Sequence, residues 1–125
     1  MTAGETGARG EAIAEDYLKQ KGYCILAKNF RTRFGEIDIV AEEEGYLAFV
    51  EVKTRKNQKF SAAREAVSFR KQQKIIAAAQ SWLQQNPTAA QPRFDVIEVY
   101  MDGSGLEQNS KTIHLQNAFE AGGPG

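Results

Sequence analysis

The stretch that decides the fold is EIDIVAEEEGYLAFVEVK, residues 36–53. It consists of two strand-like runs, residues 36–41 and 46–53, on either side of a short acidic segment that ends in a glycine. Two such runs joined by a short glycine-containing turn are typical of a β-hairpin. If the turn is centred between Glu44 and Gly45, opposed residues have numbers that sum to 89. This rule fixes which side chains face one another.

One face of the predicted hairpin is apolar. Side chains alternate across a strand, so Ile37 and Ile39 share a face. The pairing rule places Ile39 opposite Val50 and Ile37 opposite Val52. We expect these four side chains to be buried together.

The other face brings two carboxylates together, because Asp38 falls opposite Glu51, and Glu36 falls opposite Lys53. Directly opposed Cβ atoms lie ~4.5–5.5 Å apart, where like charges are destabilising. Two carboxylates that close share either a proton or a cation. Mg²⁺ is typically held by one or two carboxylates, and hard cations also accept backbone carbonyls, here that of Val52. The alternative is an amphipathic hairpin with solvated charges, and an odd-length loop would shift the pairing by one residue.

Two further residues complete the candidate catalytic set. Lys53 lies two residues after Glu51, so its ammonium shares that face and can stabilise negative charge developing on an attacked phosphate. Glu11 lies at the rim of the apolar stripe of a predicted helix over residues 10–21 and can point toward the sheet. An ordinary first-turn acid, favoured by the helix dipole, explains Glu11 equally well.

The remaining chain predicts an α/β fold with a mixed central sheet of about five strands flanked by helices. We expect one domain over residues 1–120 and a disordered tail over 121–125. The other predicted elements are strands at 24–30, 93–100 and 111–115, a turn at 102–105, and a helical segment at 62–85. The pattern does not decide whether this helical segment is broken near Ser68. In that helix, the predicted buried stripe is Ile75, Ile76, Ala79, Trp82 and Leu83, with Lys71, Lys74 and Ala78 away from it.

The charge pattern points to a phosphate backbone as partner. The chain has 16 basic and 16 acidic residues, which argues against a uniformly basic nucleic-acid binder. However, residues 53–74 carry eight basic side chains and one acid, directly after the acidic cluster of residues 36–51. A solvated helix and loop is the alternative interpretation. The candidate nucleic-acid contacts are Arg31, Arg33, Arg55, Lys56, Lys59, Lys71 and Lys74.

Other features favour a cytoplasmic protein that does not enter a membrane. The N-terminal residues have neither the basic nor the apolar region of a secretory signal, and no apolar stretch approaches the ~20 residues of a membrane span. The only cysteine, Cys24, is predicted to be a small core residue. The only histidine, His114, is predicted to have a structural or surface role, and Trp82 a core role.

Asp38 followed by Glu51-Val52-Lys53 on the next strand resembles the PD-(D/E)xK nuclease signature, although Ile37 stands where the signature's name has proline. The wider pattern resembles the YraN-like family of uncharacterised bacterial proteins, which is similar to archaeal Holliday junction resolvases. The residues that carry it lie between 7 and 119 and include Gly10-Glu11, Ala14, Tyr17-Leu18, Gly22-Tyr23, Asn29-Phe30-Arg31, 35–41, 49–55, Ala66-Val67, Lys74 and Asn117-Ala118-Phe119.

The resemblance implies a restriction-endonuclease-like core. It further implies that Asp38 and Glu51 bind Mg²⁺ or Mn²⁺, that Lys53 acts in catalysis, and that Glu11 is the acid contributed by the first helix.

The leading hypothesis is a metal-dependent endonuclease that hydrolyses phosphodiester bonds in DNA, including branched or structured DNA. A homodimer would supply the two symmetric cuts of a resolvase-like reaction. A second hypothesis is a module of the same fold that binds nucleic acid without cutting it. A third is a protein-interaction adaptor that uses the basic helix.

Overall fold

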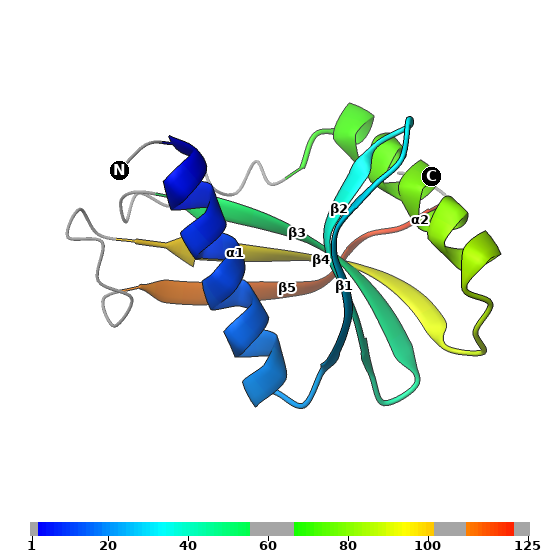
Figure 1. The fold of residues 1–125 in the computed structure, drawn as a ribbon, viewed down its shortest axis with the longest axis horizontal. Coiled ribbons are helices and arrows are strands. Elements are labelled where there is room, and N and C mark those ends of the chain that lie inside the picture. The colour runs from blue at the N-terminus through cyan, green and yellow to red at the C-terminus, as the bar shows by residue number, and fades with distance from the viewer. Residues whose placement is uncertain (1–2, 56–66, 102–109, 122–125) are drawn as a thin grey trace.

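The computed structural model describes residues 3–55, 67–101 and 110–121, and Figure 1 shows them as helices packed on one sheet. The sheet has five strands in the order β1-β2-β3-β4-β5, and only β3 and β4 are parallel. This mixed sheet with its helices confirms the α/β prediction and is consistent with a restriction-endonuclease-like core. The elements are α1 (Ala3–Gln20), β1 (Cys24–Arg31), β2 (Glu36–Glu43), β3 (Tyr46–Arg55), α2 (Phe69–Gln85), β4 (Gln91–Tyr100) and β5 (Lys111–Phe119).

All predicted elements that fall on described residues are present, with shifted ends. Helix α1 begins at Ala3 rather than at residue 10, because packing, seen in the burial of Thr6, overrides the weak helix propensity of Gly4 and Gly7. Strand β5 continues to Phe119, whose ring stacks on that of its partner Phe94 with centroids 5.1 Å apart.

Helix α2 begins at Phe69, directly after the position near Ser68 where a break was considered. Ser68 is the N-cap of α2, and its hydroxyl accepts a hydrogen bond from the Lys71 backbone N–H at 3.2 Å. The predicted helical residues 62–66, the turn at 102–105 and the tail residues 122–125 lie outside the described residues.

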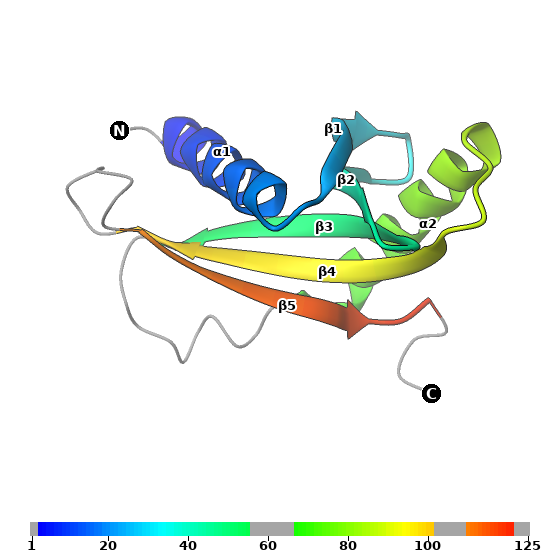
Figure 2. The same cartoon turned by 90° about the horizontal axis from the view of Figure 1, so that it is seen from below.

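Two apolar clusters lie on opposite faces of the sheet, one under each helix. Under α1, Leu18 packs with Ile39 and Val50. Under α2, Ile75 packs with Phe49, and the edge of the Trp82 ring meets Phe30 at 5.2 Å between centroids. Trp82 is thus partly buried against the core, as predicted. Figure 1 shows α1 crossing β3, β4 and β5, and Figure 2 shows it on one face of these strands. No helix in the described ranges is long and apolar enough to cross a membrane.

Three burial predictions were wrong. Ile37 packs in the α2 cluster while Ile39 packs under α1, because β2 twists as it leaves the sheet. Ala78 is fully buried, since it follows Ile75 by three residues and shares its side of α2. Cys24 is exposed rather than in the core, because it begins the edge strand β1 with its side chain turned outward.

The predicted register of the central hairpin is confirmed from Glu43–Tyr46 to Ile39–Val50. There the β2–β3 ladder ends, although β2 keeps pairing with β1 as far as Glu36. The ladder ends before the predicted Asp38–Glu51, Ile37–Val52 and Glu36–Lys53 positions, so none of these three pairs is a register pair. Strands β1 and β2 therefore diverge together from β3, which is visible in Figure 1.

A buried polar network on the α1 face of the sheet joins β4 to β5, and the contact of 3.2 Å between the Tyr17 hydroxyl and His114 Nδ1 links it to α1. The carboxylate of Asp95, which has no solvent exposure, accepts hydrogen bonds from Arg93 (2.9 Å to each oxygen), from His114 Nε2 (2.7 Å) and from the Asn117 backbone (3.0 Å). Burial alone would raise the pKa of Asp95, but the His114 and Arg93 hydrogen bonds hold it below its ordinary value. This environment supports the structural role predicted for His114.

Helix α1 approaches β3 closely at Gly10, where an added Cβ would collide with the Thr54 side chain. We predict that Gly10→Ala lowers the free energy of unfolding by about 1–3 kcal/mol through overpacking. The matched control is Gly7→Ala on the same helix, where nothing lies within 4 Å of the new Cβ. That change should stabilise the protein by about 0.5–1 kcal/mol through helix propensity. Urea unfolding of both variants measures the difference, and equal effects would contradict this packing.

Candidate functional site

The point where β2 leaves β3 opens a gap that the Asp38 side chain fills. Its Oδ2 accepts a hydrogen bond from the Val52 backbone N–H at 2.8 Å, which replaces the missing ladder bond. Because the N–H and C=O of one strand residue point toward the same neighbouring strand, the Val52 carbonyl faces this gap as well. The gap thus holds one carboxylate and one carbonyl oxygen.

Glu51 supplies the second carboxylate from β3. Its side chain lies on the α2 face of the sheet, like Phe49 two residues earlier, and is 6% exposed. Lys71 of α2 reaches down to it, with 2.9 Å between Lys71 Nζ and Glu51 Oε1. A buried carboxylate needs such a partner, since an unpaired charge there would be costly.

Asp38 and Glu51 influence each other electrostatically. Burial and, next, the neighbouring Glu51 charge together raise the pKa of Asp38 to about 6. The Val52 hydrogen bond and the Lys71 charge oppose it. For Lys71, burial would lower the pKa, but the bond to Glu51 and the surrounding carboxylates raise it overall. The two acids are therefore close enough to repel, and one ammonium partly compensates them.

Glu11 approaches the same gap from α1. Burial and then the Asp38 charge raise the pKa of Glu11, while a hydrogen bond with the Asn29 side chain lowers it. Asn29 has a positive φ of 52° within β1, a backbone conformation that asparagine tolerates better than most residues. Glu11 is thus electrostatically coupled to Asp38.

Lys53 follows Glu51 on the α2 face of β3 and is partly buried. Its register partner on β4 is Glu98, which is 1% exposed. Neither carboxylate oxygen of Glu98 has a hydrogen-bond partner in the part of the chain that is described. Glu98 was not among the predicted site residues, although an acid within the apolar run of β4 indicates a buried charge.

The oxygen donors fit a hard divalent cation. Two carboxylates and one backbone carbonyl leave room for water and phosphate oxygens, which is the usual ligand set of Mg²⁺. Among the described residues, no three Asp, Glu, His or Cys side chains are grouped closely enough to hold a metal by themselves. Glu11 therefore interacts electrostatically with Asp38 but does not form a three-carboxylate metal site with Asp38 and Glu51.

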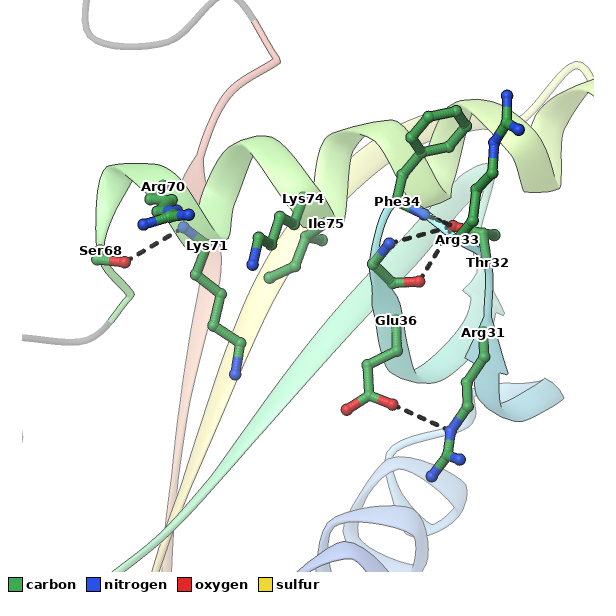
Figure 3. A pocket seen from close by; sticks show the side chains of 11 residues that line it. Arg31, Thr32, Arg33, Phe34, Glu36, Ser68, Arg70, Lys71, Lys74 and Ile75 are labelled. Carbon is green, nitrogen blue, oxygen red and sulfur yellow. Dashed lines mark hydrogen bonds and ion pairs between the residues drawn. The ribbon is translucent and has the colours of Figure 1, made fainter.

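A basic cavity of about 830 Å³ lies between the β1–β2 turn and the start of α2. Figure 3 shows Arg33 and Phe34 at the turn end, Ser68 and Arg70 at the other, and Lys71 and Lys74 between them. Lys71 lines this cavity and also contacts Glu51, so the cavity and the carboxylate pair share this side chain.

The turn that walls this cavity is held rigidly. The Thr32 hydroxyl accepts hydrogen bonds from the backbone N–H groups of Phe34 (3.0 Å) and Gly35 (3.2 Å), and the Thr32 N–H donates to the Gly35 carbonyl at 2.8 Å. Gly35 lies directly against α2, where an added Cβ would come within 2.6 Å of the Lys74 carbonyl oxygen. The turn is therefore seated on the helix backbone.

The residues predicted to contact nucleic acid are distributed unevenly around this cavity. Arg31, Arg33, Lys71 and Lys74 line it, and the Arg31 Nε forms an ion pair of 3.1 Å with Glu36. Arg55 lies at the end of β3, where its Nε is buried without a hydrogen-bond partner among the described residues. Lys56 and Lys59 lie outside the described residues. Arg70 was counted in the basic tract but not singled out as a contact.

Comparison with known proteins gives a consistent family assignment. The sequence model of the Uncharacterised protein family UPF0102 matches residues 10–99. A UPF0102 protein of Caldanaerobacter subterraneus subsp. tengcongensis is 48% identical over 114 residues, which cover 90% of this chain and 93% of that protein. One from Clostridioides difficile (strain 630) is 47% identical over 120 residues, covering 95% of this chain and 100% of that protein.

A UPF0102 protein of Clostridium botulinum (strain Loch Maree / Type A3) is 42% identical over 118 residues, covering 93% of this chain and 94% of its own length. The family match spans the hairpin, the Asp38–Glu51 pair and most of the sheet. This chain belongs to the uncharacterised, YraN-like UPF0102 family.

Proposed function

We propose that this protein is a metal-dependent endonuclease that hydrolyses phosphodiester bonds in DNA, with branched or structured DNA among its substrates. The observation that carries the proposal is the electrostatically coupled Asp38–Glu51 pair, which shares Lys71 with a basic cavity. Two neighbouring carboxylates, of which Glu51 is buried and Asp38 partly buried, are costly for a fold and well suited to a cation.

Asp38, Glu51 and the Val52 carbonyl would hold Mg²⁺ or Mn²⁺. Such an ion would polarise the phosphodiester and lower the pKa of a nearby water. Lys53, on the same face as Glu51, would stabilise the negative charge that develops on phosphorus oxygens. Glu11 would act from α1 as an acid that is coupled to Asp38.

The cations of the cavity would position the DNA backbone beside this pair. Phosphate contacts fix where a duplex or strand lies without reading its sequence. Arg33 and Lys74 are exposed there, and Arg31 lies at the same wall. Two copies of the chain would be needed to cut two strands symmetrically, so we expect a homodimer on a junction substrate. The single cysteine suits a reducing compartment such as the cytoplasm.

The second candidate is a nucleic-acid-binding module that does not cut. One observation favours it: the Lys71 ammonium already balances Glu51, so this arrangement is tolerable without a metal ion. Metal titration separates the two functions. A nuclease nicks DNA only with Mg²⁺ or Mn²⁺, whereas a binding module shows salt-sensitive affinity and no products.

We predict that Asp38→Ala and Lys53→Ala each reduce DNA cleavage at least 100-fold while the fold remains intact. The assay compares linear, flapped and four-way-junction DNAs in Mn²⁺, with circular dichroism as the check on folding. Asp16→Asn, an exposed acid on α1, is the matched control and should cleave like the parent. Equal cleavage by all three variants and the parent would exclude this site.

A stability measurement tests the carboxylate pair without relying on activity. Because the pKa of Asp38 is raised from an ordinary value of 3.8 to about 6, the folded state keeps a proton that the unfolded state has lost between those pH values. Ionised Asp38 therefore destabilises the protein above pH 6. Asn at this position keeps an oxygen for the Val52 N–H and carries no charge.

We predict that Asp38→Asn raises the free energy of unfolding by about 1–2 kcal/mol at pH 7.5, in EDTA, after allowance for partial exposure. The gain should shrink as the pH falls through 6 toward 4. Adding Mn²⁺ should raise the Tm of the parent and leave that of Asp38→Asn unchanged. A Tm increase of the same size in both proteins would place the metal elsewhere.

A further inference from the structure

The basic cavity has one lining residue that phosphate binding does not explain. Phe34 is 52% exposed, although the turn position it occupies could carry any polar side chain. The Arg33 guanidinium lies over its ring, 4.9 Å from the centroid. An aromatic ring beside cations is the combination with which proteins hold unpaired bases and their phosphates.

Phe34 differs from the other large exposed apolar side chains in its surroundings. Tyr46, at the start of β3, lines a separate cavity that also includes Arg93 and Gln116. Leu26 lines a separate hollow beside Trp82. Phe69 is 54% exposed but does not line the basic cavity. Phe34 alone among these four lines the cavity that shares Lys71 with Glu51.

The backbone that carries the Phe34 ring is held by hydrogen bonds and packing. The Thr32 hydrogen bonds hold the Phe34 backbone, and Gly35 seats the turn against the Lys74 backbone. An exposed phenyl ring held in this way loses little conformational freedom when a base stacks on it. Farther along the same cavity, Lys74 and then Arg70 supply charges for the phosphates of the DNA backbone.

We propose that this cavity binds a single-stranded segment of DNA, with an unpaired base stacked on Phe34 and the adjoining phosphates held by Arg33, Arg70 and Lys74. In a continuous duplex both faces of each base are already stacked, so only base edges and phosphates are accessible. Insertion of the ring into a duplex would first have to unstack a base step at a cost of a few kcal/mol. Phe34 therefore favours flaps, gaps and the open centres of branched DNA.

This proposal rests on the proposed function, because it takes the Asp38–Glu51 pair as the place to which the bound strand leads. It adds the class of DNA that reaches the pair. Since it concerns binding, it can be tested in EDTA, where cleavage does not occur.

The experiment measures fluorescence anisotropy with a labelled single-stranded 20-mer and with the duplex of the same sequence. Phe34→Ala should weaken single-strand binding about 10-fold and change duplex binding less than twofold. Phe34→Tyr should restore the parent affinity. Phe69→Ala, the matched control for an equally exposed phenylalanine, should bind both DNAs like the parent. Lys74→Ala should weaken both DNAs by similar factors and reduce the salt dependence.

A spectroscopic arm reports stacking directly. In a Trp82→Phe background, Phe34→Trp places the only tryptophan of the chain at the turn. Its emission should be quenched by the single strand and little affected by the duplex.

The outcomes separate the two proposals. If the parent binds neither DNA at low salt, the proposed function fails. If it binds DNA but Phe34→Ala weakens single strand and duplex equally, or has no more effect than Phe69→Ala, the stacking proposal is overturned while the proposed function stands. Selective loss of single-strand binding with quenching at position 34 supports the proposal.

Discussion

The fold depends on how the central hairpin ends. Backbone pairing between β2 and β3 stops after Ile39–Val50, and the Asp38 carboxylate satisfies the Val52 N–H that would otherwise lack a partner. One side chain thereby replaces a ladder hydrogen bond and becomes partly buried. The partial burial of Asp38 and its closeness to Glu51, which together raise the pKa of Asp38, both result from this separation of the strands. The candidate chemistry arises where regular structure is interrupted, which is common for functional sites.

The separation of the strands also explains why groups from both faces meet at one point. A closed sheet would keep Glu11 of α1 and Lys71 of α2 on opposite sides, since each helix covers its own face. At the gap both are electrostatically coupled to Asp38. The cation that balances the acids comes from one helix and the additional acid from the other. Positioning the two helices is therefore part of building the site.

Local sequence rules predicted the hairpin well. Strand alternation and the turn centre fixed the register, because a slip of one residue would have moved its apolar residues to the wrong face. The same rules placed Asp38 directly opposite Glu51; the two carboxylates do interact electrostatically, but the ladder ends one residue before that pairing. They could not predict where the ladder would end, because strand divergence depends on sheet twist and on the packing of residues far apart in the chain. Ile37 was misplaced for that reason.

Long-range partners were beyond the sequence pattern. Lys71 was predicted as a phosphate contact, and the structure places its ammonium on Glu51, twenty residues earlier in the chain. The network around Asp95 unites residues from α1, β4 and β5, and no local spacing indicates it. Ala78 was misjudged because the width of a buried helix face depends on what the helix packs against. The hairpin was therefore easier to predict from the sequence than the long-range contacts made by Glu51 and Asp95.

The seating of Gly35 on the Lys74 backbone has a consequence for how this cavity can vary among related proteins. Its two walls are spaced by a contact between main-chain atoms, with no intervening side chain to lengthen or shorten. Substitutions at Arg33, Arg70 or Lys74 can change the charge of the walls, but the distance between them stays fixed while the glycine remains. Sequence changes at this surface should therefore change how strongly a ligand is bound. The width of ligand that fits should change only when the glycine is replaced.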